Sequence, residues 1–327
     1  MSSTPILLVD SFAQIYRCYH AVRHLSTADG VPTNAVFAMT KFLLKLEKEH
    51  PSENGAFVFD KGRPRFRMEL APDYKANRPP MPEELRVQLP VIRELIRDFG
   101  WSIVEHEGYE ADDLIGSIAV AFPGHRIVIF SGDKDLSQMI DDRVEMLVPD
   151  PAGSVTRRGT EEVVKKFGVP PSGIVDYLAL IGDASDNIPG VEGVGPKTAA
   201  ALLQQFGSGE EIFRRLNEVH RESLRTKLEG AKELFEKNVK LVRLDTAPPE
   251  NTVWELRNLK RSAPDYAKIR AVAGKMELKS ILREIDAIAG PGPGEDLFAP
   301  SAPAVPEKTE PTGKTEASSN MTQMDLF

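Results

Sequence analysis

The chain of 327 residues is 41% hydrophobic and 28% charged, which is typical of a globular protein with one large core or two closely joined units. Its one cysteine, Cys18, excludes an intramolecular disulfide and a cysteine-based zinc site, and the first apolar run is too short for a signal peptide or a membrane span, so we expect a soluble cytoplasmic protein. The net charge of −8 does not exclude a nucleic-acid partner, because residues 290–327 contribute half of it (six acids against two lysines) and DNA affinity depends on where basic residues cluster.

Short apolar runs alternate with amphipathic segments in the first half of the chain. Four runs have the length of buried strands: 6–9, 56–59, 103–104 and 127–130. Two segments carry apolar residues at the three- and four-residue spacing of a helix: 35–48 and 83–99. This alternation predicts an α/β core with a mainly parallel sheet and flanking helices. Sites in such sheets gather beyond the carboxyl ends of the strands, and three runs end near an aspartate: Asp10, Asp60 and Asp133.

The second half changes character at about Thr160. Helix-like segments joined by glycine-rich turns continue to about Ala289, and the following stretch is rich in Pro, Gly, Ser, Ala and Thr, a composition typical of disorder. We therefore divide the chain into four parts: an α/β core over 1–159, a helical part over 160–289, a disordered linker over 290–322 and a short terminal peptide over 323–327.

Nine acidic residues fall into tight groups beside the apolar runs or the glycine-containing turns: Asp10; Asp60; Glu110, Asp112 and Asp113; Asp133 and Asp135; Asp183 and Asp186. So many carboxylates can converge only if cations hold them, since unpaired buried charges are very costly. Oxygen-only ligands suit Mg²⁺ or Mn²⁺, and two such ions can clamp a phosphodiester for hydrolysis. A helix cap or a turn would explain any single acid, but it explains the ensemble poorly.

Basic residues stand close to these acids in the sequence. They are Lys61, Arg63, Arg65 and Arg67, followed by Lys75 and Arg78, and Tyr74 stands directly before Lys75. A polyanion that approaches many carboxylates needs compensating cations, which would neutralise and position its phosphate. A solvated basic surface is the alternative.

Seven motifs, in order and with the expected spacing, carry a resemblance to a known family: V-D at 9–10, Y-R-C-Y-H-A at 16–21, F-D at 59–60, Y-K-A-N-R-P-P-M-P at 74–82, G-Y-E-A-D-D-L-I-G at 108–116, S-G-D-K-D-L-S-Q at 131–138 and G-D-A-S-D-N-I-P-G-V-E-G-V-G-P-K-T-A at 182–199. From about residue 5 to residue 285 the chain resembles the 5′-nuclease family, which includes the N-terminal nuclease domain of bacterial DNA polymerase I and the flap endonucleases. The resemblance implies a PIN-like nuclease core with a helical arch, and a DNA-binding part with a helix–hairpin–helix (helix–three-turn–helix) element.

The resemblance also assigns roles to site residues. It implies that Asp10, Asp60, Glu110, Asp112 and Asp113 belong largely to one metal site, with several contacts through water. It implies that Asp133, Asp135, Asp183 and Asp186 serve the second. Lys75 and Arg78 would lie at the base of the arch and contact the reacting phosphate, Tyr74 would be available to stack on a base, and Arg17 would lie near the substrate phosphate.

The stretch from Gly190 to Thr198 is predicted to form the turn of the hairpin element. Its glycines would let backbone N–H groups approach a phosphate, and the helix that follows adds a favourable dipole. The candidate DNA-binding residues are Gly190, Gly193, Gly195, Lys197 and Thr198. In the family this element grips duplex DNA without reading its sequence, often with a bound monovalent cation such as K⁺. A simple helix–helix turn is the alternative.

The chain departs from the family pattern beside its first aspartate. The family has Gly and a small polar residue there, whereas this chain has Ser11 and Phe12. Serine lacks the freedom of glycine to take a positive φ, and the ring of Phe12 stands near the first ligand. No acidic position is missing, so we still expect an active enzyme.

The last residues resemble a peptide with which bacterial replication and repair proteins bind the sliding clamp. Gln323, Leu326 and Phe327 occupy its specified positions, and a disordered linker would give the peptide reach. An apolar end without function is the alternative.

Together these features predict a metal-dependent, structure-specific 5′→3′ exodeoxyribonuclease and flap endonuclease that hydrolyses DNA near single-strand to double-strand junctions. We expect two or more Mg²⁺ ions, with Mn²⁺ as a substitute, and DNA with 5′ flaps, nicks or RNA primers as substrate, in primer removal and repair. The expected partners are the sliding clamp, DNA polymerase and ligase, with no membrane. The chain has no room for a polymerase domain, so we expect a free-standing nuclease. A non-catalytic junction-binding protein and a structure-specific ribonuclease are the alternatives.

Overall fold

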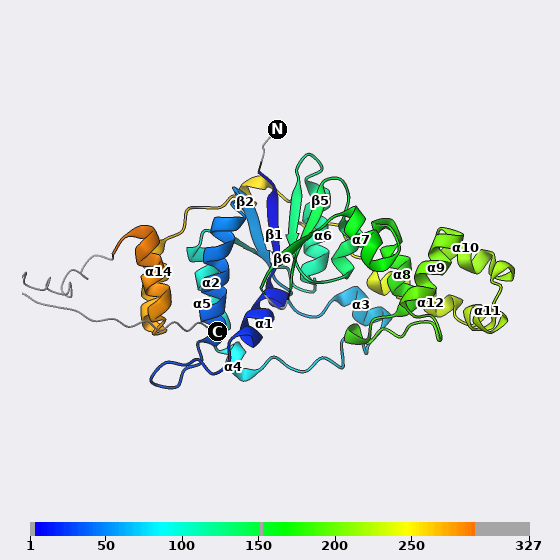
Figure 1. The fold of residues 1–327 in the computed structure, drawn as a ribbon, viewed down its shortest axis with the longest axis horizontal. Helices are drawn as coiled ribbons and strands as arrows, with labels where there is room; N and C mark the ends of the chain where they lie inside the picture. The colour runs from blue at the N-terminus through cyan, green and yellow to red at the C-terminus, as the bar shows by residue number, and fades with distance from the viewer. Residues whose placement is uncertain (1–3, 151–152, 292–327) are drawn as a thin grey trace, which may run out of the picture. The chain divides into compact units, whose positions relative to one another are not determined.

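A six-stranded sheet forms the centre of the fold (Figure 1). The computed structural model describes residues 4–150 and 153–291. The strands are β1 (Ile6–Asp10), β2 (Asn54–Val58), β3 (Ser102–Val104), β4 (Ile127–Phe130), β5 (Val144–Pro149) and β6 (Val155–Arg158). They are ordered β3-β2-β1-β4-β5-β6, and every neighbouring pair is parallel except β5 and β6. The predicted α/β core with a mainly parallel sheet is confirmed.

The two faces of the sheet are buried against different helices, because side chains alternate along each strand. Ile6 and Leu8 of β1 face a core shared with α6 (Ala111–Ala121) and α8 (Ile174–Ile181). Leu7 and Val9 face a core shared with α1 (Ser11–Ala21), α2 (Asn34–Glu49) and α5 (Leu89–Asp98). The strand order reverses at β1, where β2 lies on one side and β4 on the other, so the carboxyl ends of β1 and β4 are the expected place for a site.

The segment predicted as one helix over 83–99 is broken in two. It forms α4 (Glu83–Arg86) and α5, which begins at Leu89 with Pro90 in its first turn. Proline has no N–H to continue a preceding helix but fits a helix start, which explains the break. A chain without regular structure joins α3 (Arg65–Leu70) to α4 and spans the lower side of Figure 1.

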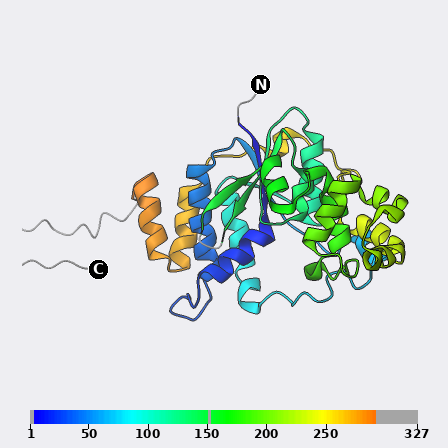
Figure 2. The same ribbon diagram turned by 45° about the vertical axis from the view of Figure 1, so that its right-hand side comes forward.

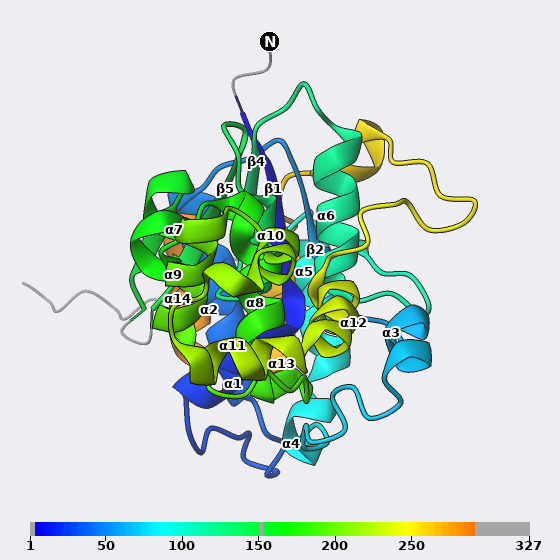
Figure 3. The same cartoon turned by 90° about the vertical axis from the view of Figure 1, so that its right-hand side faces the viewer.

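Most helices of the second half form a group of their own, seen at the right of Figure 1 and in front of the sheet in Figure 3. They are α7 (Thr160–Phe167), α8, α9 (Pro196–Phe206), α10 (Gly209–Arg214), α11 (Glu222–Glu229) and α12 (Lys232–Val242). A predicted helical part is therefore present.

The last two helices return to the other face of the sheet. The contacts place α13 (Tyr266–Lys275) against α5 and α14 (Lys279–Ala289) against α2, and Figure 2 shows these orange helices beside the blue α2. The proposed linker over 290–322 falls almost wholly, and the terminal peptide over 323–327 wholly, outside the described residues. Within residues 4–150 and 153–291, no helix has both the length and the apolar character needed to cross a bilayer.

Candidate active site

The first group of acids lies where β1, β2 and β4 end. Asp10 ends β1 and caps α1, and its carboxylate accepts hydrogen bonds from the backbone N–H of Ala13 (3.3 Å) and the hydroxyl of Ser131 (2.8 Å). Asp60 follows β2 and accepts from the backbone N–H of Ala111 (3.2 Å), in the first turn of α6. The turns after parallel strands thus bring acids that are far apart in the sequence to one edge of the sheet.

The electrostatics of this group show that its carboxylates face one another. Burial raises the pKa of Asp10 to about 7, and the charges of Asp60 and Asp133 add to the shift. Burial also raises the pKa of Asp112 well above its ordinary value, followed by the charges of Asp133, Asp10 and Asp60. Like charges held together away from water disfavour one another, so the group has a strong demand for cations. This demand and its all-oxygen donor set fit divalent metal ions.

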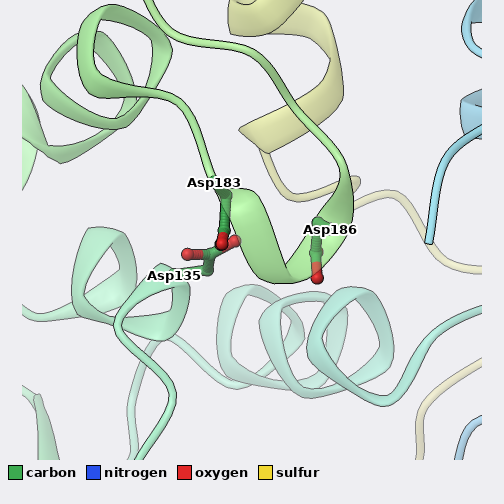
Figure 4. A group of neighbouring side chains, drawn as sticks. All are labelled: Asp135, Asp183 and Asp186. Atoms are coloured by element: carbon green, nitrogen blue, oxygen red, sulfur yellow. The ribbon is translucent and has the colours of Figure 1, made fainter. Parts of the chain in front are cut away.

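A second group consists of Asp135, Asp183 and Asp186, which each have one carboxylate oxygen within 4.8 Å of those of the other two (Figure 4). Asp183 caps a short 3₁₀ turn, Ala184–Asp186, and accepts from the backbone N–H of Ser185 (2.9 Å). Burial raises the pKa of Asp135, with the charges of Asp133 and Asp183 next in size. In the described part of the chain, no protein group donates a hydrogen bond to the buried Oδ1 of Asp135. A buried carboxylate oxygen without such a partner suits a metal ligand.

Asp133 stands between the two groups. Its charge raises the pKa of Asp10 and of Asp112 in the first group, and its own pKa is raised by burial and by the charge of Asp186 in the second. The backbone N–H of Asp135 donates to Asp133 (2.9 Å), and the backbone N–H of Asp133 donates to Ser131 (3.0 Å), which fixes this turn. Asp133, which the sequence-based division placed in the second group, thus interacts through its charge with acids of both groups.

Asp113 is turned away from the other acids toward Arg67. The guanidinium of Arg67 is buried, and it donates to both carboxylate oxygens of Asp113 (2.6 and 2.8 Å) and to Glu110 (2.7 Å). Asp113 also accepts from the backbone N–H of Asp245 (2.9 Å). The structure thus does not bring Asp113 together with the metal-binding candidates, and it gives Arg67, which the sequence showed only as part of a basic run, the role of an internal counter-ion.

Lys75 and Arg78 lie beside acids of both groups. The ammonium of Lys75 contacts Glu110 and lies 3.5 Å from Asp186, and Arg78 donates to Asp186 (2.5 Å). The backbone of Lys75 has a φ of 56°, which is uncommon for a residue other than glycine, and its N–H donates to the carbonyl of Asp186 (3.0 Å). Backbone strain of this kind is tolerated where function requires an exact placement of the side chain.

Tyr74 does not have the exposure that base stacking requires. Only 7% of it is exposed, and its hydroxyl lies 3.0 Å from a carboxylate oxygen of Asp186 and 3.2 Å from one of Glu110. The expected stacking role is therefore corrected: Tyr74 is placed to position two carboxylates.

Arg17 donates to the backbone carbonyl of Asp150 and lines a cavity of about 200 Å³ together with Asp133.

The two unusual residues after Asp10 fit without distortion. Ser11 is helical, in the first turn of α1, so the positive φ that a glycine would permit is not needed. The ring of Phe12 packs edge-on against Phe59, with 5.4 Å between ring centres. It lines a cavity of about 450 Å³ whose walls also include Tyr16, Asp60, Arg63, Lys75, Arg78 and Met81. Phe12 thus forms a wall beside the site.

The glycines of the predicted hairpin serve different purposes. A Cβ at Gly190 would lie 2.2 Å from the carbonyl oxygen of Ile181, so glycine there permits a close approach of two backbones. Gly193 has a φ of +76°, which favours glycine, whereas Gly195 caps α9 and a Cβ there would meet nothing within 4 Å. Lys197 is exposed and Thr198 half-buried in the first turn of α9. In the described part of the chain, no side chain caps this helix start by a hydrogen bond.

Two family models match the chain. The model described as "5'-3' exonuclease, N-terminal resolvase-like domain" covers residues 5–168, and "5'-3' exonuclease, C-terminal SAM fold" covers residues 169–267. A 5'-3' exonuclease of Aquifex aeolicus is 39% identical over 295 residues, which are 90% of this chain and 99% of that protein. DNA polymerase I of Pseudomonas aeruginosa is 46% identical over 215 residues, which are 65% of this chain and 23% of the polymerase.

Solved structures share the fold. A bacteriophage T5 flap endonuclease, in a pseudo-enzyme–product complex with DNA and metal ions, matches with a TM-score of 0.62 and 22% identity over 86% of this chain and 98% of that one. The catalytic core of Rad2 in complex with DNA substrate matches with a TM-score of 0.58 and 17% identity, over 86% of this chain and 92% of that one. With the sequence relationships and the acidic groups at the strand ends, these findings identify the chain as a member of the 5′-3′ exonuclease family of metal-dependent nucleases.

Proposed function

We propose that this protein is a structure-specific 5′→3′ exonuclease and flap endonuclease that removes RNA primers and DNA flaps during replication and repair. The observation that carries the proposal is the convergence of two groups of carboxylates, joined by Asp133, at the carboxyl ends of β1 and β4, with Lys75 and Arg78 directly beside them. A site that is rich in both acids and bases suits a phosphodiester, which needs metal ions and cations on its oxygens at once.

The proposed metal ligands are the acids that face one another: Asp10, Asp60, Glu110, Asp112, Asp133, Asp135, Asp183 and Asp186. Bound there, two or more Mg²⁺ ions, or Mn²⁺ in their place, would supply an activated water and stabilise the leaving oxygen. Asp113 would act at one remove, because it fixes Arg67 and through it Glu110.

The basic and aromatic residues would handle the substrate. Lys75 and Arg78 would bind and orient the scissile phosphate, with Arg17 near a neighbouring phosphate. The rings of Phe12 and Tyr16, which line the cavity beside the site, would exclude water from the apolar side of the reacting nucleotide. Tyr74 would hold Glu110 and Asp186 in place while the phosphate binds.

Cleavage of an end-labelled 5′-flap duplex tests the proposal. We expect cutting near the junction with Mg²⁺, none with EDTA, and none for Asp133→Ala, because this residue serves both groups. As a control, Asp142→Ala removes the same charge as Asp133→Ala but at an exposed position, and this variant should cut like the native chain. Binding without cutting in both Mg²⁺ and Mn²⁺ would favour a non-catalytic junction-binding protein instead, and preference for an RNA flap of the same sequence would favour a ribonuclease.

The hairpin before α9 is proposed to grip duplex DNA through its phosphates, with Gly190, Gly193, Gly195, Lys197 and Thr198 shaping the contact and a K⁺ ion bound at the turn. Lys197→Ala should weaken duplex binding for all sequences alike and reduce the salt dependence by about one unit of slope in log K against log salt. Fluorescence anisotropy in KCl and in NaCl measures both effects. Lys268→Ala, on α13, is the control and should leave the slope unchanged. An unchanged slope for Lys197→Ala as well would contradict this assignment.

Clamp binding is proposed from the sequence alone, since Gln323, Leu326 and Phe327 lie outside the described residues. A chain that lacks residues 323–327 should lose its affinity for the sliding clamp and keep its cutting of naked flaps. Retained clamp binding in a pull-down would refute the peptide assignment.

The expected products, a 5′-phosphate and a 3′-hydroxyl, are the ends that ligase joins after polymerase has filled the gap, which supports these two enzymes as partners in the same pathway.

A further inference from the structure

The three carboxylates of the second group are compensated unequally. Asp186 is contacted by Arg78 at 2.5 Å, by Tyr74 at 3.0 Å and by Lys75 at 3.5 Å. Among the residues that the structure describes, Asp183 has one basic partner, Lys134, whose ammonium lies 2.8 Å from its Oδ2. Asp135 has a buried oxygen without a protein partner in the described part of the chain. Lys134, which the sequence analysis passed over, therefore neutralises a good part of this group.

The two oxygens of Asp183 are held in different ways. Its Oδ1 accepts from the backbone N–H of Ser185 at 2.9 Å and from the Ser185 hydroxyl at 2.7 Å, both within the same short turn. Its Oδ2 faces only the long, flexible side chain of Lys134 among the interactions of the described residues. One oxygen is thus anchored by local chain geometry, while the other is bound by a partner that can leave without moving the carboxylate.

Lys134 is itself free to leave. Asp183 is its only ion-pair partner within residues 4–150 and 153–291, and its side chain is 33% exposed. The other two cations of this group each have a second partner. Lys75 also contacts Glu110, and Nε of Arg78 lies 3.4 Å from the carbonyl oxygen of Ser185. A lysine carries a compact charge on a four-carbon stem, so it can swing away where a forked guanidinium cannot.

A divalent ion that binds Asp135, Asp183 and Asp186 competes with Lys134 for Oδ2 of Asp183, since both are cations that need the same oxygen. We propose that Lys134 is an internal counter-cation that holds the second group together without metal and is displaced when the metal binds, so that it sets the divalent-ion concentration at which this group fills. The proposal rests on the proposed function only in taking these acids as metal ligands.

Manganese titration without DNA tests this exchange. Bound Mn²⁺, followed by electron paramagnetic resonance, should show that Lys134→Gln binds Mn²⁺ about fivefold to tenfold more tightly at one site. That site should be the one that Asp183→Asn removes. Lys134→Arg should bind Mn²⁺ no more tightly than the native chain, because it keeps the competing charge. Lys232→Gln, which removes an exposed lysine on α12 that lies 3.8 Å from Glu236, is the matched control and should have no effect.

Thermal unfolding provides a second readout. In EDTA, Lys134→Gln should have a lower Tm than the native chain, because Asp183 loses its cationic partner beside two other carboxylates, and saturating Mn²⁺ should remove the difference. Equal or weaker Mn²⁺ binding by Lys134→Gln would overturn the proposal, as would an unchanged Tm in EDTA. Neither experiment uses DNA cleavage. If the native chain cuts flaps but Lys134→Gln has an unchanged Mn²⁺ affinity, only the exchange is refuted. If Lys134→Gln binds Mn²⁺ more tightly but the native chain cuts no flap, only the proposed nuclease function is refuted.

Discussion

Arg67→Met is expected to lower the free energy of unfolding by about 3–5 kcal/mol, because it would leave the buried carboxylate of Asp113 without its cation and Glu110 with Lys75 alone. Arg67 is 3% exposed, and besides Glu110 and Asp113 it donates to the backbone carbonyl of Leu241 at 2.8 Å. One guanidinium thus ties α3 to the start of α6 and to the end of α12. Urea denaturation in EDTA, followed by circular dichroism, measures the loss.

Two further variants separate charge from geometry. Arg67→Lys keeps the charge but loses the forked pair of donors, so its stability should fall between those of the native chain and Arg67→Met. Met replacement at Arg63, which is exposed in the same basic run, should leave stability unchanged. A native-like stability for Arg67→Met would mean that Glu110 and Asp113 do not need this cation, and the role assigned to Arg67 would be wrong.

Asp112→Asn and Asp113→Asn should have opposite effects, although the two residues are neighbours. Asp112→Asn is expected to reduce flap cleavage by at least about a thousandfold, equivalent to about 4 kcal/mol of barrier. It should also raise the Tm in EDTA, because burial and the charges of Asp133, Asp10 and Asp60 disfavour its ionised form. Asp113→Asn should lower the Tm, because it weakens the buried pair with Arg67.

Differential scanning calorimetry in EDTA and single-turnover cleavage with Mg²⁺ give the two readouts. The outcome that contradicts the assignment is a lower Tm for Asp112→Asn together with native-like cleavage, since that would make Asp112 a structural residue. The same experiment decides the role of Asp113, because a direct metal ligand would lose cleavage without losing stability in EDTA.

The sequence predicted the strands well where burial is complete. The run at 127–130 coincides with β4, and the run at 6–9 with most of β1, because a parallel strand that is covered on both faces is an unbroken apolar stretch. Strand β5 and the edge strand β6 escaped notice, since Glu145, Arg157 and Arg158 interrupt their apolar pattern. The return of α13 and α14 to α2 and α5 also escaped notice, because helical periodicity shows which face is apolar but not what covers it.

The acidic groups of the site could be predicted from residue types, but the direction of each side chain could not. Successive residues of a helix point about 100° apart, so Asp112 and Asp113 of α6 face different surroundings although the sequence presents them as a pair. The burial of Tyr74 depends on contacts with Glu110 and Asp186, which are far away in the sequence. Lys134 was overlooked because a lysine between two acids is ordinary on a surface.

The position of α13 and α14 has a consequence for synthesis on the ribosome. Leu43 of α2 and Ile92 of α5 share a buried core with Ile269, Ile281 and Ile285. A chain grows from its N-terminus, and its parts fold as they emerge. The part of α2 and α5 that α13 and α14 cover therefore stays uncovered during the synthesis of more than 150 intervening residues. The core around α2 and α5 is therefore completed only after α14 has been made, although the acids of the site, up to Asp186, are made earlier.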